Sequence, residues 1–212
     1  MNYFDLINKC LVELNYKKCR TFVELTKNDH EKIKNILNII NAEVCSFDNW
    51  SFLLRKVQID LPKNTGEIIN SVPGRIHAIF IDGVKYEYYS DFEKFLLNNQ
   101  PSNTYTSFND KLLVPIFNQD KTIEVIYYTN KFAQNQNGED IAQMDAETDA
   151  SVVPIPFVEP ILVYGTCMRL KANPENSKFS YWFGMYKDAI ANLRSKIGTN
   201  ALDAPQINLF RY

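Results

Sequence analysis

The stretch at residues 75–89, RIHAIFIDGVKYEYY, carries the clearest structural signal in the sequence. Two runs rich in β-branched and aromatic residues flank the pair Asp82-Gly83. Both central residues of a type I′ turn need a positive φ, and Asp-Gly is one of the pairs that supply it. The stretch therefore predicts a β-hairpin with strands at 75–81 and 84–89.

The segments on both sides of this hairpin also favour strands. After Trp50, apolar and polar residues alternate until Pro62, which predicts one more strand. Segments 112–117 and 122–129 are β-rich and enclose a polar bend, which predicts a second hairpin. These strands together predict an antiparallel β-domain.

Both ends of the sequence have a helical period instead. Apolar residues recur every three or four positions in four segments, 6–14, 30–46, 160–170 and 179–197. Thr26 and Asp29 have the spacing of a capping box, which would start the second helix. An apolar stripe on the last helix predicts core packing; it consists of Phe179, Trp182, Phe183, Tyr186, Ile190, Leu193 and Ile197.

The expected fold class is α+β, with a helical bundle built from the N- and C-terminal helices and a central antiparallel β-domain of two hairpins. The bundle takes residues 1–47 plus 157–198, and the β-domain takes 50–130. Residues 131–152 are polar and predict a loop. Residues 199–212 show no period and predict an extended C-terminal arm.

Two sets of residues in these segments are candidate contact sites. The loop carries five acidic side chains without the spacing of a calcium loop, so it is either a solvated loop or an electrostatic surface; they are Glu139, Asp140, Asp145, Glu147 and Asp149. The arm carries four apolar or aromatic side chains with no regular element to cover them; they are Ile207, Leu209, Phe210 and Tyr212.

The sequence offers no catalytic site. It lacks phosphate-binding glycine loops and the GxSxG elbow. His30 and His77 have no ligand spacing around them and are expected at a surface or a sheet edge, and the four cysteines predict free thiols. With 23 basic and 25 acidic residues, the chain lacks the positive surplus of a protein that grips nucleic acid. We therefore expect no enzyme activity, no cofactor and no metal, and neither a signal peptide nor a membrane span.

The order of the motifs resembles the head-to-tail adaptor (connector) proteins of tailed bacteriophages, the tail tubular protein A and podoviral tail accessory group. The matching features are, in order, a short helix at 6–14, a long helix at 31–44, Trp50-Ser51-Phe52, a strand ending at Leu61-Pro62, Val72-Pro73 before the strand–turn–strand of 79–84, the tyrosine-ended strand 123–128, a proline-led helix at 160–170 and the Tyr-Ala-Arg helix at 186–194.

This resemblance implies a structural virion protein of the neck or tail, present in the host cytoplasm during assembly. Members form rings, commonly of twelve copies, beneath the portal, where they extend the DNA channel and join capsid to tail. The implied partners are other copies of the chain, the portal protein and further tail or ring proteins, with DNA passing through without sequence-specific binding. The arm would dock on the portal or on a neighbouring subunit. The acidic loop is longer than the usual connection of the family, so its role is not carried over from it, and we expect the loop separately to face the channel or a tail component.

Two alternatives stay open from the sequence. The chain could be another neck or tail-tube ring protein of the virion. It could also be a small cytoplasmic enzyme with an unrecognised site that uses a cysteine or a tyrosine.

Overall fold

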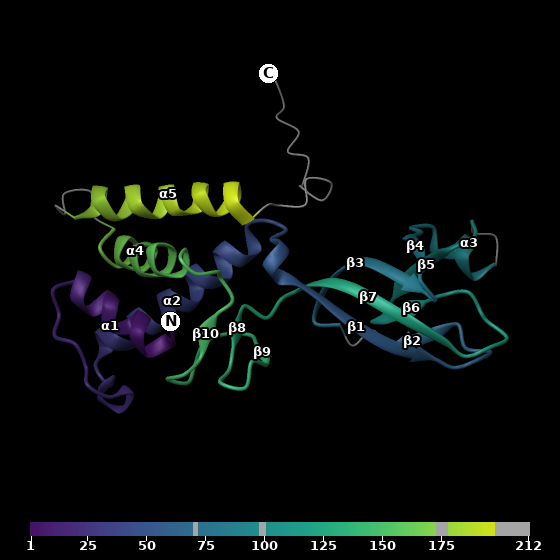
Figure 1. Ribbon diagram of the computed structural model, residues 1–212, viewed down its shortest axis with the longest axis horizontal. Coiled ribbons are helices and arrows are strands. Elements are labelled where there is room, and N and C mark those ends of the chain that lie inside the picture. Colours follow the sequence, from purple (N-terminus) through teal and green to yellow (C-terminus); the bar gives the residue numbers. More distant parts are fainter. Residues whose placement is uncertain (70–71, 98–100, 173–177, 198–212) are drawn as a thin grey trace, which may run out of the picture. The chain divides into compact units, whose positions relative to one another are not determined.

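The fold is mixed α+β, as predicted, and the computed structural model describes residues 1–69, 72–97, 101–172 and 178–197 (Figure 1). The chain forms two units. The first, the helical unit, combines residues 1–53 with the chain from Lys131 onward, and the second, the β-unit, is Leu54–Asn130. The boundary leaves Trp50 in the helical unit rather than at the start of the β-unit.

The helical unit contains four long helices. They are α1 (Tyr3–Glu13), α2 (Asn28–Ser46), α4 (Val158–Leu170) and α5 (Phe179–Ile197). Short 3-10 helices lie at Phe22–Glu24 and Ser51–Leu53. Helix α4 contacts α1, α2 and α5, and lies between α5 and the other two (Figure 1). It can fill this position because it is apolar on nearly every side, with Ile161, Leu162 and Cys167 fully buried.

Trp50 closes the core of this unit beyond the end of α2. Its ring is fully buried, stacks on Phe52 at 5.8 Å between centroids, and donates a hydrogen bond from Nε1 to the Val44 carbonyl at 2.7 Å. That bond gives a second donor to a carbonyl in the last turn of α2, which also accepts from the Phe47 backbone N–H at 3.3 Å. Trp182 on α5 is also buried, and its Nε1 donates to Glu13 at 3.1 Å.

The predicted capping box of α2 is wrong. Helix α2 begins at Asn28, and His30, not Asp29, reaches back to the start of the helix. The His30 Nδ1 accepts a hydrogen bond from the Lys27 backbone N–H at 3.4 Å. His30 is also 6% exposed, so the predicted surface position is wrong for this residue.

The β-unit is one seven-stranded sheet with the order β1-β7-β3-β4-β5-β6-β2. Its strands are β1 (Leu54–Leu61), β2 (Glu67–Ile69), β3 (Gly74–Ile81), β4 (Val84–Tyr88), β5 (Thr104–Phe108), β6 (Lys111–Leu113) and β7 (Lys121–Thr129), and a short helix α3 (Phe92–Leu96) precedes β5. All neighbours pair antiparallel except β4 and β5. Apolar residues from β1, β3 and β7 fill its core, among them Leu61, Ile79 and Val125.

The hairpin around Asp82-Gly83 forms as predicted. Strands β3 and β4 pair from Ile79 to Tyr86, and Asp82 and Gly83 have φ values of 50° and 79°. A further glycine is required at the start of β3. Gly74 has a φ of 151°, and a Cβ there would lie 2.0 Å from the Tyr128 carbonyl oxygen, so no side chain fits.

The second predicted hairpin is wrong. Strand β7 pairs with β1 and β3, and β6 pairs with β5 and β2 instead. The β5–β6 connection is the pair Asn109-Asp110, with φ values of 46° and 58°. Pro115 follows soon after β6 and offers no N–H for further pairing.

The segment 131–152, predicted as a loop, contains a small three-stranded antiparallel sheet. Its strands are β8 (Ala133–Gln134), β9 (Asp140–Ile141) and β10 (Ala150–Ser151), in the order β10-β8-β9. The sheet is anchored to the helical unit by backbone bonds from the start of α1, where the Tyr3 N–H donates to the Asp149 carbonyl at 2.7 Å. Buried Met144 fixes it further, because Asn38 on α2 bonds both its backbone N–H and its carbonyl.

Candidate functional site

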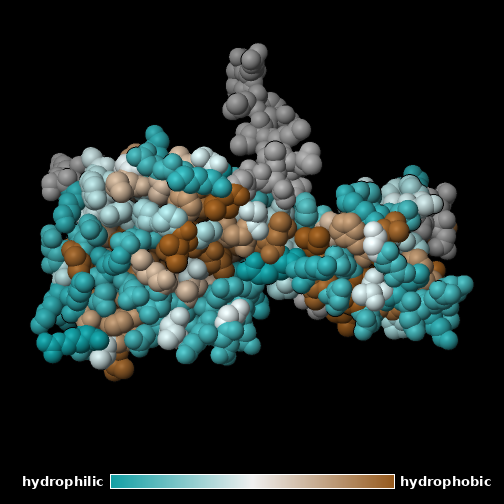
Figure 2. All heavy atoms as spheres, in the orientation of Figure 1, coloured by the Kyte–Doolittle hydropathy of each residue, from teal (hydrophilic) through white to brown (hydrophobic). Residues whose placement is uncertain are grey.

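The most distinctive surface of the helical unit is an apolar groove between the last turn of α2 and the length of α5. Its volume is about 710 Å³. Six apolar or aromatic residues line it, Val44, Phe47, Phe183, Tyr186, Ile190 and Ala191. Figure 2 shows hydrophobic surface on this unit along α4 and at the C-terminal end of α5.

The groove exists because of the way α5 packs on α4. The buried residues of α5 are Trp182, Ala189 and Leu193. Phe183 lies about 100° further round the helix from Trp182 and is 49% exposed. The prediction that the whole aromatic stripe of α5 is core packing is therefore wrong, since one part of it lines an open surface.

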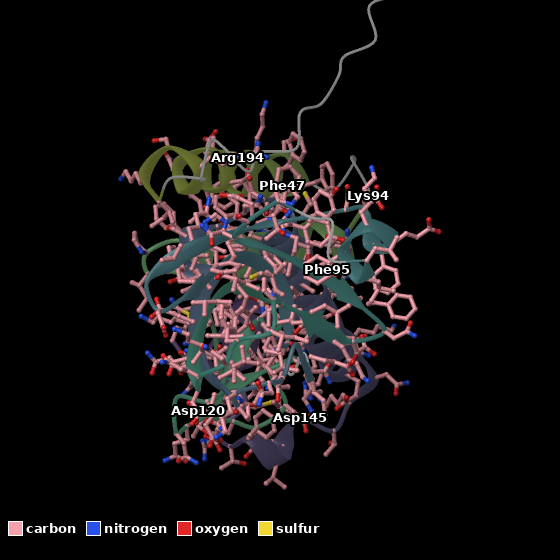
Figure 3. All side chains as sticks on the ribbon, turned by 90° about the vertical axis from the view of Figure 1, so that its right-hand side faces the viewer. Phe47, Lys94, Phe95, Asp120, Asp145 and Arg194 are labelled. Carbon is pink, nitrogen blue, oxygen red and sulfur yellow. The ribbon has the colours of Figure 1, made fainter. Side chains whose placement is uncertain are left out.

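Phe47 supplies the opposite wall. It is the C-cap residue directly after α2, and its side chain is 59% exposed. The Arg194 guanidinium lies over this ring, 4.2 Å from Cζ to the centroid. Figure 3 labels the two residues close together. Arg194 also pairs with Asp48, with Nε 3.6 Å from Oδ2. A cation on the ring face and a carboxylate behind it orient Phe47 without covering it.

Charged side chains form the rim of the groove. Glu43 accepts two hydrogen bonds from Arg169, at 2.8 and 3.0 Å, in a bidentate pair. Lys187 and Arg194 contribute positive charge. Burial raises the pKa of the Tyr186 hydroxyl in the wall, and the nearby Glu43 carboxylate raises it further. An apolar floor with aromatic residues, arginine and a polar rim is typical of a protein-contact surface.

The two predicted contact sets have different outcomes. Ile207, Leu209, Phe210 and Tyr212 lie outside the described residues. Of the acidic set, Glu139, Asp145 and Glu147 are exposed and Asp140 is half-buried.

Asp149 is 4% exposed and does not face solvent. Its Oδ2 accepts hydrogen bonds from the backbone N–H groups of Asp145 and Ala146, both at 2.8 Å, so this carboxylate shapes the segment. Asp145 lies on the opposite side of the helical unit from Phe47 and Arg194 (Figure 3).

Three cysteines and one tyrosine of the helical unit are buried in its core. Cys10, Cys45 and Cys167 are buried free thiols, and burial raises the pKa of Cys45 to about 12. A thiol that holds its proton is a weak nucleophile. Burial, followed by the negative charges of Asp145 and Glu31, raises the pKa of Tyr3.

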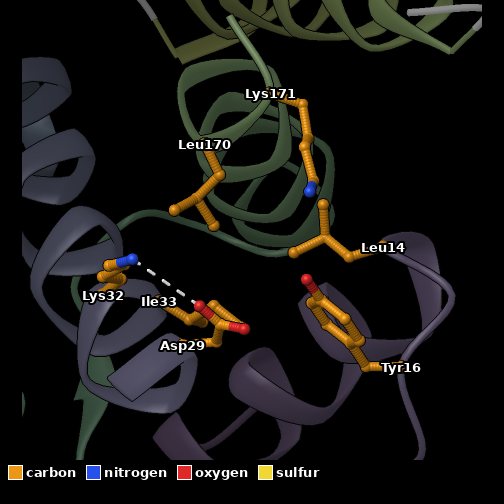
Figure 4. Close-up of a pocket in the computed structure, with 7 residues that line it drawn as sticks. All are labelled: Leu14, Tyr16, Asp29, Lys32, Ile33, Leu170 and Lys171. Atoms are coloured by element: carbon orange, nitrogen blue, oxygen red, sulfur yellow. Dashed lines mark ion pairs between the residues drawn. The ribbon is translucent and has the colours of Figure 1, made fainter.

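A second, smaller pocket lies between the ends of α1, α2 and α4 (Figure 4). Its volume is about 130 Å³, and its walls include Tyr16, Lys171 and an ion pair of 3.7 Å between Asp29 and Lys32. Both members of that pair are more than half exposed. This volume is below the roughly 300–1,000 Å³ of typical ligand pockets, so the larger groove is the better candidate site.

Comparison of the sequence with models of known protein families and with curated proteins finds no match. In the described ranges, no three His, Cys, Asp or Glu side chains gather as a metal site requires. Among the helices of those ranges, none is both long enough and apolar enough to cross a bilayer.

Proposed function

We propose that this chain is a ring-forming structural subunit of a bacteriophage neck, bound beneath the portal, where twelve copies extend the DNA channel and join capsid to tail. The protein is not an enzyme and uses no cofactor under this proposal. The observation that carries it is the groove between α2 and α5, an open aromatic surface of the kind that protein partners cover.

The chemistry of the groove supports a contact role over catalysis. Its walls are apolar and aromatic, and the rim charges of Glu43 and Arg194 are paired with Arg169 and Asp48. Aromatic residues and arginine are the types enriched where protein interfaces hold most tightly. The residues that line the groove include no His or Cys.

The division of the chain also supports the proposal. Helices from both ends of the sequence share one unit, and the sheet is formed by the residues between them. The periods of the sequence predict this plan, and the order of motifs in the resemblance is compatible with it. The motif Trp50-Ser51-Phe52 lies at the junction between the helical and β segments of the chain, as the resemblance also implies.

The arm and the acidic segment have roles in this proposal. Residues 199–212 dock on the portal or, failing that, on a neighbouring subunit. The exposed carboxylates Glu139, Asp145 and Glu147 face either the channel, where they repel the DNA backbone within a Debye length of about 8–10 Å, or the next tail component. A formal net charge of −2 is compatible with a channel through which DNA passes without binding.

The variant Phe47→Ser tests this proposal, with Val23→Ser as its matched control. Both residues are exposed apolar side chains of the helical unit, at 59% and 84%, but only Phe47 lines the groove. Losing the burial of one Phe costs about 1.5–3 kcal/mol, which is on the order of ten- to hundredfold in each subunit contact. The assay is mass photometry of the full chain mixed with portal-bearing capsids.

We expect Phe47→Ser to reduce ring assembly on the portal and Val23→Ser to leave it unchanged. Equal ring assembly by both variants would remove the groove from the proposal. A wild-type chain that stays monomeric on the portal and turns over a substrate would instead support the enzyme alternative.

A further inference from the structure

The groove between α2 and α5 lies close to the point where the described chain ends. Arg194, on its rim, is three residues before Ile197, the last residue of α5. The Ile197 carbonyl accepts a hydrogen bond from Ser51 Oγ at 3.1 Å, which holds this end of α5 against the helical unit. Fifteen residues follow it in the sequence.

We propose that residues 203–212 of the same chain occupy this groove in the free subunit. The groove needs an apolar occupant, since Phe47 and Phe183 are 59% and 49% exposed without one. The segment contains three apolar side chains that also require burial, Ile207, Leu209 and Phe210. Mutual burial removes both apolar surfaces from water.

The length of the chain permits this contact. The ten residues from Ile197 to Ile207 span up to about 33 Å when extended. The groove wall on α5, from Phe183 to Arg194, is about 16 Å long. The segment can therefore leave the end of α5, turn back and reach every part of the groove.

The charges agree with this occupant. Lys187 lies on the α5 side of the rim and Glu43 on the α2 side, and the segment carries one charge of each sign, Asp203 before its apolar residues and Arg211 after them. Because the segment is tethered beside the groove, its effective concentration there is in the millimolar range, roughly what a short flexible linker gives. A contact that would be weak between separate molecules therefore forms within one chain.

This contact regulates assembly, and that consequence rests on the proposed function. A segment that covers the groove keeps free subunits from associating through it. A portal that binds the segment would uncover the groove, so subunits would close into a ring only where a portal is present.

A disulfide-trapping experiment on the full chain tests the contact. Cys19 is the one native cysteine among the four that is not buried, so Cys19→Ser gives a suitable background. Ala191→Cys places a thiol in the groove and Asn208→Cys places one in the segment. The matched control pairs Asn208→Cys with Asn192→Cys, the next residue of α5, which is exposed but does not line the groove.

At low protein concentration we expect an intramolecular disulfide between positions 191 and 208, identified by mass spectrometry of proteolytic fragments. It should form on the order of tenfold faster than the control disulfide because the segment is held at the groove. Adding Phe210→Ser should bring the rate down to that of the control.

Equal rates for the groove and control pairs would overturn the proposal. So would a disulfide that forms only between two molecules, in a mixture of the two single-cysteine variants, because the segment would then bind a neighbour instead. Ring assembly on the portal is measured separately. If the disulfide fails to form but rings assemble, only this inference fails; if it forms and rings do not assemble, only the proposed function fails.

Discussion

Replacing Gly165 with alanine tests how closely α4 packs between its neighbours. A Cβ at Gly165 would lie 3.0 Å from the Tyr186 ring and 3.1 Å from the Ile40 Cγ2. Both distances are shorter than ordinary contacts between carbon atoms, so one neighbour must move. Ile40 is 1% exposed and has no free space, whereas Tyr186 borders the groove and can shift toward it.

The control is Gly184→Ala on α5. A Cβ at Gly184 meets no atom within 4 Å, so this change only removes a residue that disfavours helix. It should stabilise the protein by about 0.8–1 kcal/mol. Gly165→Ala gains the same amount but loses about 1–3 kcal/mol to overpacking, so it should be less stable than the control by that difference.

Urea unfolding followed by tryptophan fluorescence measures the stability of the helical unit, to which α4 belongs. Trp50 and Trp182 are the two tryptophans of the sequence, and both belong to the helical unit. With an m-value of about 2 kcal/mol/M, the midpoint for Gly165→Ala should lie on the order of 1 M below that for Gly184→Ala. Equal upward shifts for the two variants would refute the close packing of α4 against α2 and α5.

Three further changes have defined outcomes. Trp50→Ala should lower the free energy of unfolding by about 3–5 kcal/mol, measured by circular dichroism, because it empties a fully buried site. A shift in melting temperature of only about a degree would contradict this. Burial, then the positive charges of Lys27 and Lys34, lowers the pKa of His30 from 6.5, so the stability present above that pH is lost as the pH falls through the folded-state pKa. His30→Gln should flatten this pH dependence of the free energy of unfolding, measured from pH 8 down to about pH 5. An unchanged slope would contradict the role of His30. Gly74→Ala should reduce hydrogen-exchange protection in β3 and β7, because the new Cβ would collide with the Tyr128 carbonyl. Tryptophan fluorescence should stay unchanged, since both tryptophans belong to the helical unit. Unchanged protection would contradict this prediction.

The sequence predicted the features that depend on neighbours along the chain. The turn at Asp82-Gly83 follows from two adjacent residues, and the limits of α5 from a single periodic segment. The second hairpin was wrong because the partners of β7 are distant in sequence. The hairpin that forms instead, between β5 and β6, had a local signal, since Asn109-Asp110 is a pair that tolerates positive φ at both positions.

The groove depends on tertiary packing and could not be predicted from the sequence. The stripe of α5 is wider than the contact that α4 makes with it, and the period alone does not say which side is covered. Trp182 is buried and Phe183 is exposed, although both belong to the same aromatic stripe. In the acidic segment, the burial of Met144 and Asp149 follows from bonds to α1 and α2 that the polar composition did not indicate.

A reconstruction of the neck of the virion by cryo-electron microscopy tests the proposed function most directly. The account predicts a closed ring of this chain, most simply of twelve copies, in contact with the portal and coaxial with the DNA channel. Purified virions that lack the chain, or that hold it away from the portal and not as a ring, would contradict the account.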